Sequence, residues 1–391
     1  MSDPRRSESP HGAVWHIVTC EYPPDVGGVA DHTRLVAAGL AGAGDRVHVW
    51  CAGRSGATAE RSGVVVHRSL GTFSPADLRR VDVLLTRCAP PRRLLVQWVP
   101  HGYGYRAMNL GFCLWLWRRA RVDGDDVELM VHEPFLEFAA RSWRQSAAAA
   151  VHRVMTAVLL RAARRIWMST PSWGARLRPY AGRLPLRWLP VPSNVPVVAD
   201  ADAVASIRAR YAPDGEFLAG HFGTYDRQSV ATLAGVTPAL LAARRHVRVL
   251  LLGRGGERVR DAVVRARPDL GERVHAPGTL PLEDVSRHLG ACDAMLQPYP
   301  DGVSTRRTSV MAALAHGLPV LTTAGRLTEP LWAARGAVAL APAGDGRALV
   351  AAAGALVDDA GRRAHLAAAA RSLYEECFAA RHVITALRGA A

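Results

Sequence analysis

Short apolar runs alternate along the chain with longer segments whose apolar residues recur every three or four positions. The short runs predict buried strands, and the longer segments predict helices. The strands expected in the first half are 13–19, 46–51, 64–67, 83–85, 94–99, 127–131 and 165–169. Those expected in the second half are 217–222, 247–252, 274–277, 294–298 and 319–323. Helices are expected between these strands and over the alanine-rich 346–388. The alternation predicts an α/β protein with parallel sheets.

Two domains are expected from the length and from one proline-rich segment. The 391 residues suit two units of roughly 100–200 residues, and 188–198 (WLPVPSNVPVV), which contains three prolines, is interpreted as the linker. A strand, a glycine-rich turn, a helix and a strand open the chain over 13–51, which is typical of a Rossmann-like domain. Ligands bind such domains at the carboxyl ends of the strands. We therefore expect two doubly wound domains that face each other across a cleft.

Composition excludes several classes of protein. Hydrophobic residues make up 49% of the chain and charged residues 21%, which excludes a disordered chain. No apolar run approaches the roughly 20 residues of a membrane span. The first residues are polar and the six cysteines are dispersed, so we expect a cytoplasmic protein with reduced thiols. No G-x-G-x-x-G follows the first strand, which argues against a dinucleotide site.

The positive charge is unevenly distributed. The net charge is +15, with +11 over residues 1–196, and every basic residue is arginine. The stretches 83–122 and 138–199 contain seven and ten arginines and no acid. Helices are expected at 108–121 and 147–165, and their arginines allow three interpretations. The helices contact an anionic membrane, they attract an acidic acceptor, or they pack their apolar faces inward and leave the arginines in water. We favour the last interpretation. No recognition motif accompanies the charge, so no nucleic acid partner is expected.

Five segments in order along the chain carry a family resemblance. They are EYPPDVGGVADHTRLVAAGLAGAGDRVHVW, VPSNVP, HFGTYD, VLLLGRG and APGTLPLEDVSRHLGACDAMLQPYPDGVSTRRTSVMAALAHGLPVLTT. These segments resemble nucleotide-sugar glycosyltransferases of the GT-B fold, specifically glycosyltransferase family 4. The resemblance implies an acceptor-binding domain (1–196), a nucleotide-sugar-binding domain (197–371) and a last helix (372–391) that crosses back to the first domain. It also implies transfer from a nucleotide diphosphate sugar to an acceptor, with retained configuration, no metal and no cofactor besides this co-substrate.

The turn Gly27-Gly28 precedes the first expected helix. Glycine lets the backbone approach a diphosphate, and a helix presents unpaired N–H groups and the positive end of its dipole. The turn either contacts phosphate, which the resemblance favours, or is an ordinary strand-to-helix turn. Asp31, in the first helical turn, either caps the helix or contacts a sugar hydroxyl.

Two histidines follow strands of the first domain. His132 comes directly after 127–131, where residues of a cleft are found, and histidine can hydrogen-bond and titrates near neutrality. The resemblance places His132 near the reacting centre; the alternative is a solvated loop histidine. His101 and Tyr103, after 94–99, are expected to contact the acceptor.

A cluster of hydroxyl and arginine side chains precedes the apolar helix expected at 310–315. Backbone N–H groups and guanidinium groups can clamp a diphosphate together; the alternative is a capped helix with solvated arginines. The residues of this cluster are Ser304, Thr305, Arg306 and Arg307. The resemblance adds further donor contacts at Gly223, Thr224, Tyr225, Arg227 and Arg254.

The sequence departs from the family pattern at the donor site. Family 4 usually has two glutamates spaced E-x7-E, and Ser304 and Ala312 stand at these positions. Thr224 and Ser229 stand where the family usually has a basic pair, so the arginines are expected to compensate. The alternatives are a pseudo-glycosyl or S-/N-glycosyl transferase of specialised metabolism, and a catalytically silent GT-B partner subunit. No cluster of residues has metal-ligand spacing, so no metal site is expected.

Overall fold

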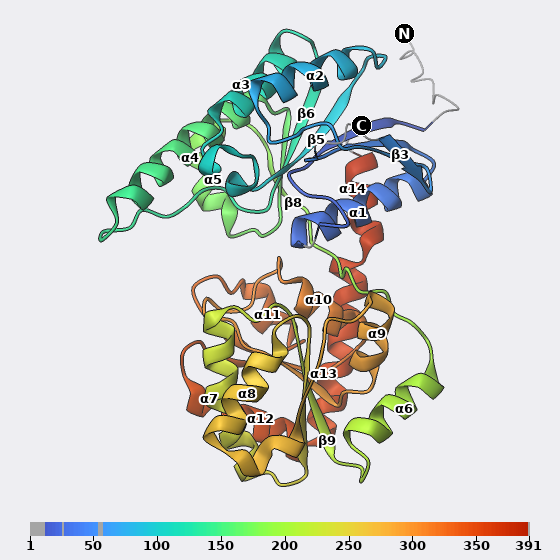
Figure 1. Ribbon diagram of the computed structural model, residues 1–391, viewed down its shortest axis with the longest axis vertical. Helices are drawn as coiled ribbons and strands as arrows, with labels where there is room; N and C mark the ends of the chain where they lie inside the picture. Colours follow the sequence, from blue (N-terminus) through green and yellow to red (C-terminus); the bar gives the residue numbers. More distant parts are fainter. Residues whose placement is uncertain (1–11, 26, 54–57, 390–391) are drawn as a thin grey trace, which may run out of the picture. The chain divides into compact units, whose positions relative to one another are not determined.

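The computed structural model describes residues 12–25, 27–53 and 58–389, which form two compact units (Figure 1). One unit spans Met1–Pro190 together with Ala380–Ala391, and the other spans Val191–Ala379. We call them the N-terminal and the C-terminal unit. Each has one sheet, and the fold class is the expected α/β class with two Rossmann-like units.

The sheet of the N-terminal unit has eight strands within the described residues. Neighbouring strands are parallel except β3 and β4, which are antiparallel. In spatial order the strands are β3 (Thr58–Arg61), β4 (Val64–His67), β2 (Arg46–Trp50), β1 (Val14–Val18), β5 (Arg93–Trp98), β6 (Asp126–Val131), β7 (Arg165–Met168) and β8 (Leu186–Trp188). β1 is central, and its Ile17 pairs with Val49 on one side and Leu95 on the other.

Polar side chains cap several helices of this unit. Asn109 and Ser142 each accept a hydrogen bond from the backbone of the first turn that follows. The helices are α1 (Gly28–Gly42), α2 (Pro75–Thr86), α3 (Leu110–Arg121), α4 (Trp143–Ala162), α5 (Trp173–Ala181) and α14 (Ala380–Arg388), with the short η1 (Pro100–Gly102) and η2 (Tyr105–Ala107). Their apolar faces cover a core that contains four fully buried tryptophans, Trp15, Trp50, Trp98 and Trp167.

The strand predicted at 83–85 is wrong, because these residues lie in α2. Ser74 and Asp77 form a reciprocal capping box and Pro75 occupies the first turn, which starts a helix at this point. The buried positions Leu78, Val81 and Leu85 then recur every three or four residues. A three-residue apolar run was too short to distinguish this helix face from a strand.

The last helix, α14, belongs to the N-terminal unit. Ile384 lies where a side chain at Gly39 of α1 would be. The Leu387 carbonyl accepts a hydrogen bond from Arg93 Nη2 at 2.8 Å, and the Arg388 guanidinium lies 3.2 Å from the Asp45 carboxylate. Polar as well as apolar contacts thus hold the end of the chain in this unit.

The C-terminal unit contains a six-stranded parallel sheet within the described residues. Its spatial order is β11 (Val274–Gly278), β10 (Val247–Leu252), β9 (Phe217–Phe222), β12 (Ala294–Gln297), β13 (Val320–Ala324) and β14 (Ala339–Pro342). Its helices are α6 (Ala201–Tyr211), α7 (Arg227–Ala243), α8 (Gly256–Ala266), α9 (Leu282–Gly290), α10 (Thr308–Ala315), α11 (Pro330–Arg335), α12 (Gly346–Asp358) and α13 (Ala360–Leu373), with η3 (Pro268–Arg273) and η4 (Tyr374–Phe378). Helices cover both faces of the sheet, with α7 and α12 packed together and α10 against α13 (Figure 1). The alanine-rich tail is divided at Asp359, which caps α13, and again at η4.

Candidate functional site

His132 lies at the carboxyl edge of the N-terminal sheet, and its backbone is held from three sides. Its N–H donates to the Trp98 carbonyl at 3.0 Å. Its carbonyl accepts hydrogen bonds from Trp173 Nε1 at 2.9 Å and from Ser169 Oγ at 3.3 Å. The residue that was predicted to be a solvated loop histidine or a group near the reacting centre is therefore half-buried and firmly placed.

A buried amide links the His132 ring to a second histidine. Gln97 Oε1 lies 2.8 Å from His132 Nε2 and 3.2 Å from His32 Nδ1, and the two rings meet edge to face at 4.8 Å. Burial lowers the pKa of His32 to about 4, so this ring is neutral near pH 7. Sequence reasoning missed both Gln97 and His32. A glutamine inside the otherwise apolar strand RLLVQW was the available signal.

The turn Gly27-Gly28, which was predicted to contact phosphate, lies beside the carboxylate of Glu21. Glu21 Oε1 accepts hydrogen bonds from the Val29 and Ala30 N–H groups, each at 3.0 Å. A side chain at Gly27 would overlap the Glu21 carboxylate, so glycine is required there to let the carboxylate approach. The positive end of α1 is thus occupied by a carboxylate in place of the predicted diphosphate.

The two residues predicted to contact the acceptor lie in different environments. His101 is exposed, and its Nδ1 lies 3.7 Å from Glu133 Oε2. Tyr103 is fully buried; its ring stacks on Phe112 at 4.3 Å and its hydroxyl donates to the Gln97 carbonyl at 2.5 Å. The prediction for Tyr103 is therefore wrong, because no acceptor reaches a side chain inside the core. Asp31 is half-buried in the first turn of α1.

Two glycine loops meet at the carboxyl edge of the C-terminal sheet. Gly253, after β10, has φ +114, and a side chain there would lie 2.3 Å from the Gly223 carbonyl oxygen. Gly223, after β9, donates its N–H to the Leu252 carbonyl at 3.2 Å. Only glycine at 253 allows this backbone contact, which brings both loops to one place at the edge.

Arg307 lies beside these loops. Its guanidinium lies 4.5 Å from the centre of the Tyr299 ring, and the Tyr299 hydroxyl shares a 2.7 Å hydrogen bond with Ser309 Oγ. A side chain at Gly223 would lie 3.9 Å from Ser309 Oγ, so Ser309 is close to the loop after β9. No ion pair of Arg307 is found within the described ranges. Burial first, and the neighbouring Arg306 next, lower the pKa of Arg307, and these effects outweigh the opposite effect of Asp301 and Asp226.

Ser304 and Thr305 are not available to a ligand, which corrects their prediction as donor contacts. Both are buried. The Thr305 N–H and hydroxyl donate to the Glu329 carboxylate at 2.9–3.2 Å, and Trp332 Nε1 donates to the same carboxylate at 2.8 Å. Glu329 thus fixes this loop from inside, a role that nothing in the local sequence indicated.

Tyr225 is also a structural residue. Its ring is buried, and its hydroxyl donates to the His221 and Leu252 carbonyls at 3.4 and 3.3 Å. The prediction that Tyr225 contacts the donor is therefore wrong. The other predicted residues in the loops after β9 and β10, namely Thr224, Arg227 and Arg254, are exposed.

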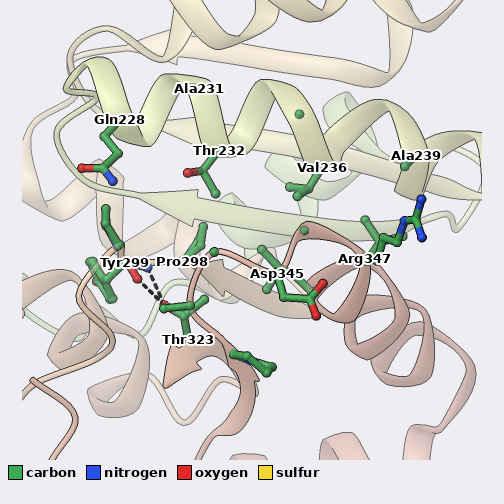
Figure 2. A pocket seen from close by; sticks show the side chains of 18 of the residues that line it. Gln228, Ala231, Thr232, Val236, Ala239, Pro298, Tyr299, Thr323, Asp345 and Arg347 are labelled. Carbon is green, nitrogen blue, oxygen red and sulfur yellow. Dashed lines mark hydrogen bonds between the residues drawn. The ribbon is translucent and has the colours of Figure 1, made fainter. Parts of the chain in front are cut away.

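A pocket of about 1090 Å³ lies between α7 and the loop from β14 to α12 (Figure 2). Small and apolar residues of α7 form one wall, and Asp345 and Arg347 lie opposite. Tyr299 lines its end, where its backbone exchanges hydrogen bonds with Thr323 Oγ1 at 2.8 and 2.6 Å. No residue predicted from the sequence lines this pocket. Tyr299 thus lines this pocket and also contacts Arg307 through its ring.

The described part of the chain has no metal cluster, no disulfide and no membrane-spanning helix. No group of three or more histidine, cysteine or carboxylate side chains could hold a metal ion there. All six cysteines are free thiols. No described helix has both the length and the apolar character needed to cross a bilayer.

Comparisons with known proteins find a family-model match within the C-terminal unit and similar structures for both units. Residues 217–359 match the family model Glycosyl transferases group 1, and no curated protein sequence matches the chain. Sucrose-phosphate synthase from Thermosynechococcus elongatus has a similar structure (TM-score 0.76, 16% identity, 97% of this chain and 98% of that one). HepE from Anabaena in complex with UDP (0.65, 15%, 97% and 99%) and WaaG, a glycosyltransferase involved in lipopolysaccharide biosynthesis (0.64, 16%, 96% and 99%), are similar as well. The chain therefore has the two-unit GT-B fold of these structures, and residues 217–359 of its C-terminal unit match the Glycosyl transferases group 1 model.

Proposed function

We propose that the chain transfers a sugar from a nucleoside diphosphate sugar to an acceptor nucleophile, with the nucleotide bound by the C-terminal unit. The observation that carries this proposal is Arg307, a half-buried cation over Tyr299 with no carboxylate partner within the described residues. A guanidinium in such a place gains a partner when a diphosphate binds. Arg306 precedes it in the chain and supplies a second positive charge.

The proposed reaction retains configuration and uses no metal. The bond from the anomeric carbon to the diphosphate oxygen breaks, and a bond from the same carbon to the acceptor oxygen forms on the same face. The acceptor proton passes to the departing diphosphate. Arg306 and Arg307 stabilise the charge that develops on this leaving group, and His132 contributes a hydrogen bond near the reacting centre.

Uridine is the first candidate for the nucleoside. HepE from Anabaena was solved with UDP and with UDP-glucose, and a further similar structure from E. coli was solved with UDP-2-fluoro glucose. These neighbours are 10–15% identical to this chain, so they support a trial of UDP conjugates and do not select the sugar.

We also propose that the N-terminal unit contacts an anionic membrane near its acceptor. Exposed apolar residues lie at the start of α4, in the loop before it and in and beside η2. Hydrogen bonds of His152 with Ala107 and of Arg153 with Leu136 connect η2 and this loop to the middle of α4. Exposed arginines without ion pairs in the described residues accompany them. We call this set the Trp143 surface; it consists of Tyr105, Arg106, Met108, Leu136, Phe138, Arg141, Trp143 and Arg144. Aromatic and arginine side chains together favour the headgroup region of anionic bilayers.

A thermal-shift panel with UDP, GDP, ADP and dTDP, alone and as sugar conjugates, tests the donor site. A ligand at 100 times its dissociation constant adds about 2.7 kcal/mol of stability. We expect one nucleoside diphosphate to give a clear shift, and its conjugates then identify the sugar. No shift with any of them would contradict the proposal and favour a catalytically silent GT-B subunit.

A further inference from the structure

Gln97 occupies an unusual position for a polar side chain. It lies on β5, the strand next to the central β1, and none of its surface is exposed. Tyr103 fixes its backbone through the 2.5 Å hydrogen bond to the Gln97 carbonyl. A buried amide destabilises a protein unless it makes hydrogen bonds, and the side-chain bonds of Gln97 go to two histidine rings.

The Gln97 oxygen determines which ring nitrogens carry hydrogen. An amide oxygen can only accept hydrogen bonds. His132 must therefore carry its hydrogen on Nε2, and His32 on Nδ1, for both contacts to form. The Nδ1–H form is the less common tautomer of histidine in water, so the contact with Gln97 selects it for His32. In the neutral form of His132 the lone pair is then on Nδ1.

His32 supports this arrangement from behind the His132 ring. It is buried on α1, and its ring meets the His132 ring at 81°. Neither His32 Nε2 nor Gln97 Nε2 has a hydrogen-bond partner within the described structure. Two unsatisfied buried nitrogens cost stability, which is a reason to look for a functional role of the group in addition to a structural one.

We propose that Gln97 is a positioning residue for His132, which fixes the orientation and tautomer of the ring so that its Nδ1 accepts a hydrogen bond from a hydroxyl of the bound sugar or acceptor. The inference rests on the proposed function of His132. It also restricts the chemistry: a neutral ring with a lone pair on Nδ1 accepts from a hydroxyl and does not bind phosphate, which is itself an acceptor. An amide at 97 adds no charge beside the two rings, whereas a carboxylate there would stabilise an imidazolium.

Two substitutions of Gln97 test this, with Gln297 as a matched control. Gln97→Met keeps the length of the side chain and removes the acceptor; Gln97→Glu keeps the acceptor and adds charge. Gln297 is a fully buried glutamine at the end of β12, so Gln297→Met gives a comparable loss of a buried amide away from the histidines. The imidazole nitrogens of His132 and His32 are followed by NMR in ¹⁵N-histidine-labelled protein, with His132→Asn and His32→Asn to assign them.

The tautomer measurement needs no substrate, so it is independent of the proposed function. We expect His32 to lose its Nδ1–H form in Gln97→Met and to keep it in Gln297→Met. We expect Gln97→Glu to hold a second proton on one of the two rings near neutral pH. Unchanged ring signals in both Gln97 variants would overturn the inference, whatever the enzyme turns out to transfer.

Turnover provides the second readout. Hydrolysis of UDP-glucose, or of the conjugate selected by the thermal-shift panel, is followed as release of the nucleoside diphosphate. We expect Gln97→Met to lower kcat about tenfold or more with little change in KM, and Gln297→Met to leave kcat near the wild-type value. Equal kcat for Gln97→Met and wild type would overturn the positioning role. A wild-type protein that shifts with no nucleotide would instead contradict the proposed function.

Discussion

The two units of this protein carry positive charge in opposite ways. The N-terminal unit is the more basic by sequence, yet its buried arginines are paired: Arg92 and Arg119 with Asp125, and Arg93 with Glu128. The C-terminal half has a net charge of only +4, but its Arg307 is half-buried without an ion pair in the described residues. Anion binding is therefore expected in the less basic unit, because an arginine that already has a carboxylate partner gains little from a ligand.

The sheet order explains how the N-terminal charges are neutralised. The two acid-free stretches flank a short acidic segment, 123–137, which contains β6. β6 lies between β5 and β7, so Glu128 contacts Arg93 of β5 and Arg165 of β7 at 2.8 and 3.1 Å. Charges that are separated along the chain are thus adjacent in the fold. A charge count along the sequence overestimates the positive field of this unit.

The largest effect is expected where a buried pair is broken. Asp125→Ala leaves Arg92 and Arg119 buried without their closest carboxylate, which lies 2.6 and 2.5 Å from them. Removing one partner of a buried pair costs about 3–5 kcal/mol. We expect denaturant unfolding of the N-terminal unit to report a loss of this size. Arg164→Ala, which removes an exposed pair with Asp126 in the same segment, should change stability by less than about 1 kcal/mol. Equal losses of unfolding free energy in Asp125→Ala and Arg164→Ala would show that burial does not make one ion pair more important for stability than the other.

At Arg307 we expect a substitution to reduce ligand affinity and not stability. Arg307→Met should leave stability unchanged or raise it, because a half-buried cation without an ion pair is removed. Affinity for the nucleoside diphosphate should fall by about 1.5–3 kcal/mol, or roughly 10- to 150-fold, because a charge-assisted bond is lost. Calorimetric titration with UDP measures this, and Arg265→Met, on an exposed turn of α8, is the control. Unchanged affinity in Arg307→Met would remove this residue from the donor site.

Acid should act on the N-terminal unit through a stack of three histidines. His16 and His48 are stacked at 5.1 Å, His48 and His67 at 5.3 Å, and Trp50 Nε1 donates to His16 Nδ1 at 3.2 Å. Burial first, and the neighbouring histidines next, lower the pKa of His16 to about 3; burial lowers that of His67 to about 4. The unfolded chain binds these protons near pH 6.5 and the folded chain does not, so stability falls as the pH decreases from about 6.5 to 3–4.

His16→Gln tests this pH dependence, because glutamine can still accept from Trp50 and does not titrate. At pH 5 the His16 contribution amounts to roughly 2 kcal/mol. We expect the variant to lose less stability than the wild type between pH 7 and pH 5, as measured by denaturant unfolding at each pH. Parallel curves for the two proteins would assign the acid sensitivity to other groups.

The fold was predictable because each unit buries its strands on both faces, which makes short apolar runs visible in the sequence. β4, β9 and β10 have the predicted bounds. β3, β8 and β14 are short strands at sheet edges and were missed. β3 (TAER) and β8 (LRW) have charged residues among their apolar ones, and the short alanine-rich run of β14 does not distinguish a strand from a helix. The strand at 83–85 was mispredicted because a helix of period 3.6 can place three apolar residues close together in sequence.

The candidate sites were less predictable, because residue type does not determine burial. Tyr103, Tyr225 and Thr305 have groups that suit a ligand, but the protein uses all three groups internally. Glu21 and Glu329 were missed for the converse reason: their partners are backbone N–H groups 8 to 24 positions away. Arg307 was predicted from its place before an apolar helix. Its lack of a carboxylate partner is a property of the fold that the sequence does not reveal.

The smallest effects on stability are expected at the Trp143 surface, whose exposed arginines have no ion pair in the described residues. Arg141→Gln with Arg144→Gln should not change the free energy of unfolding by more than about 0.5 kcal/mol. Each arginine near an anionic bilayer contributes about 1 kcal/mol, so the double variant should bind vesicles containing phosphatidylserine about 30-fold more weakly at low salt. Trp143→Ala should weaken binding at high salt as well, because its contribution is apolar.

Arg260→Gln with Arg265→Gln, on exposed positions of α8, controls for net charge. Equal sedimentation of all variants, or of the wild type with anionic and neutral vesicles, would contradict a membrane contact here. In that case the exposed aromatic residues would be better explained by a protein partner.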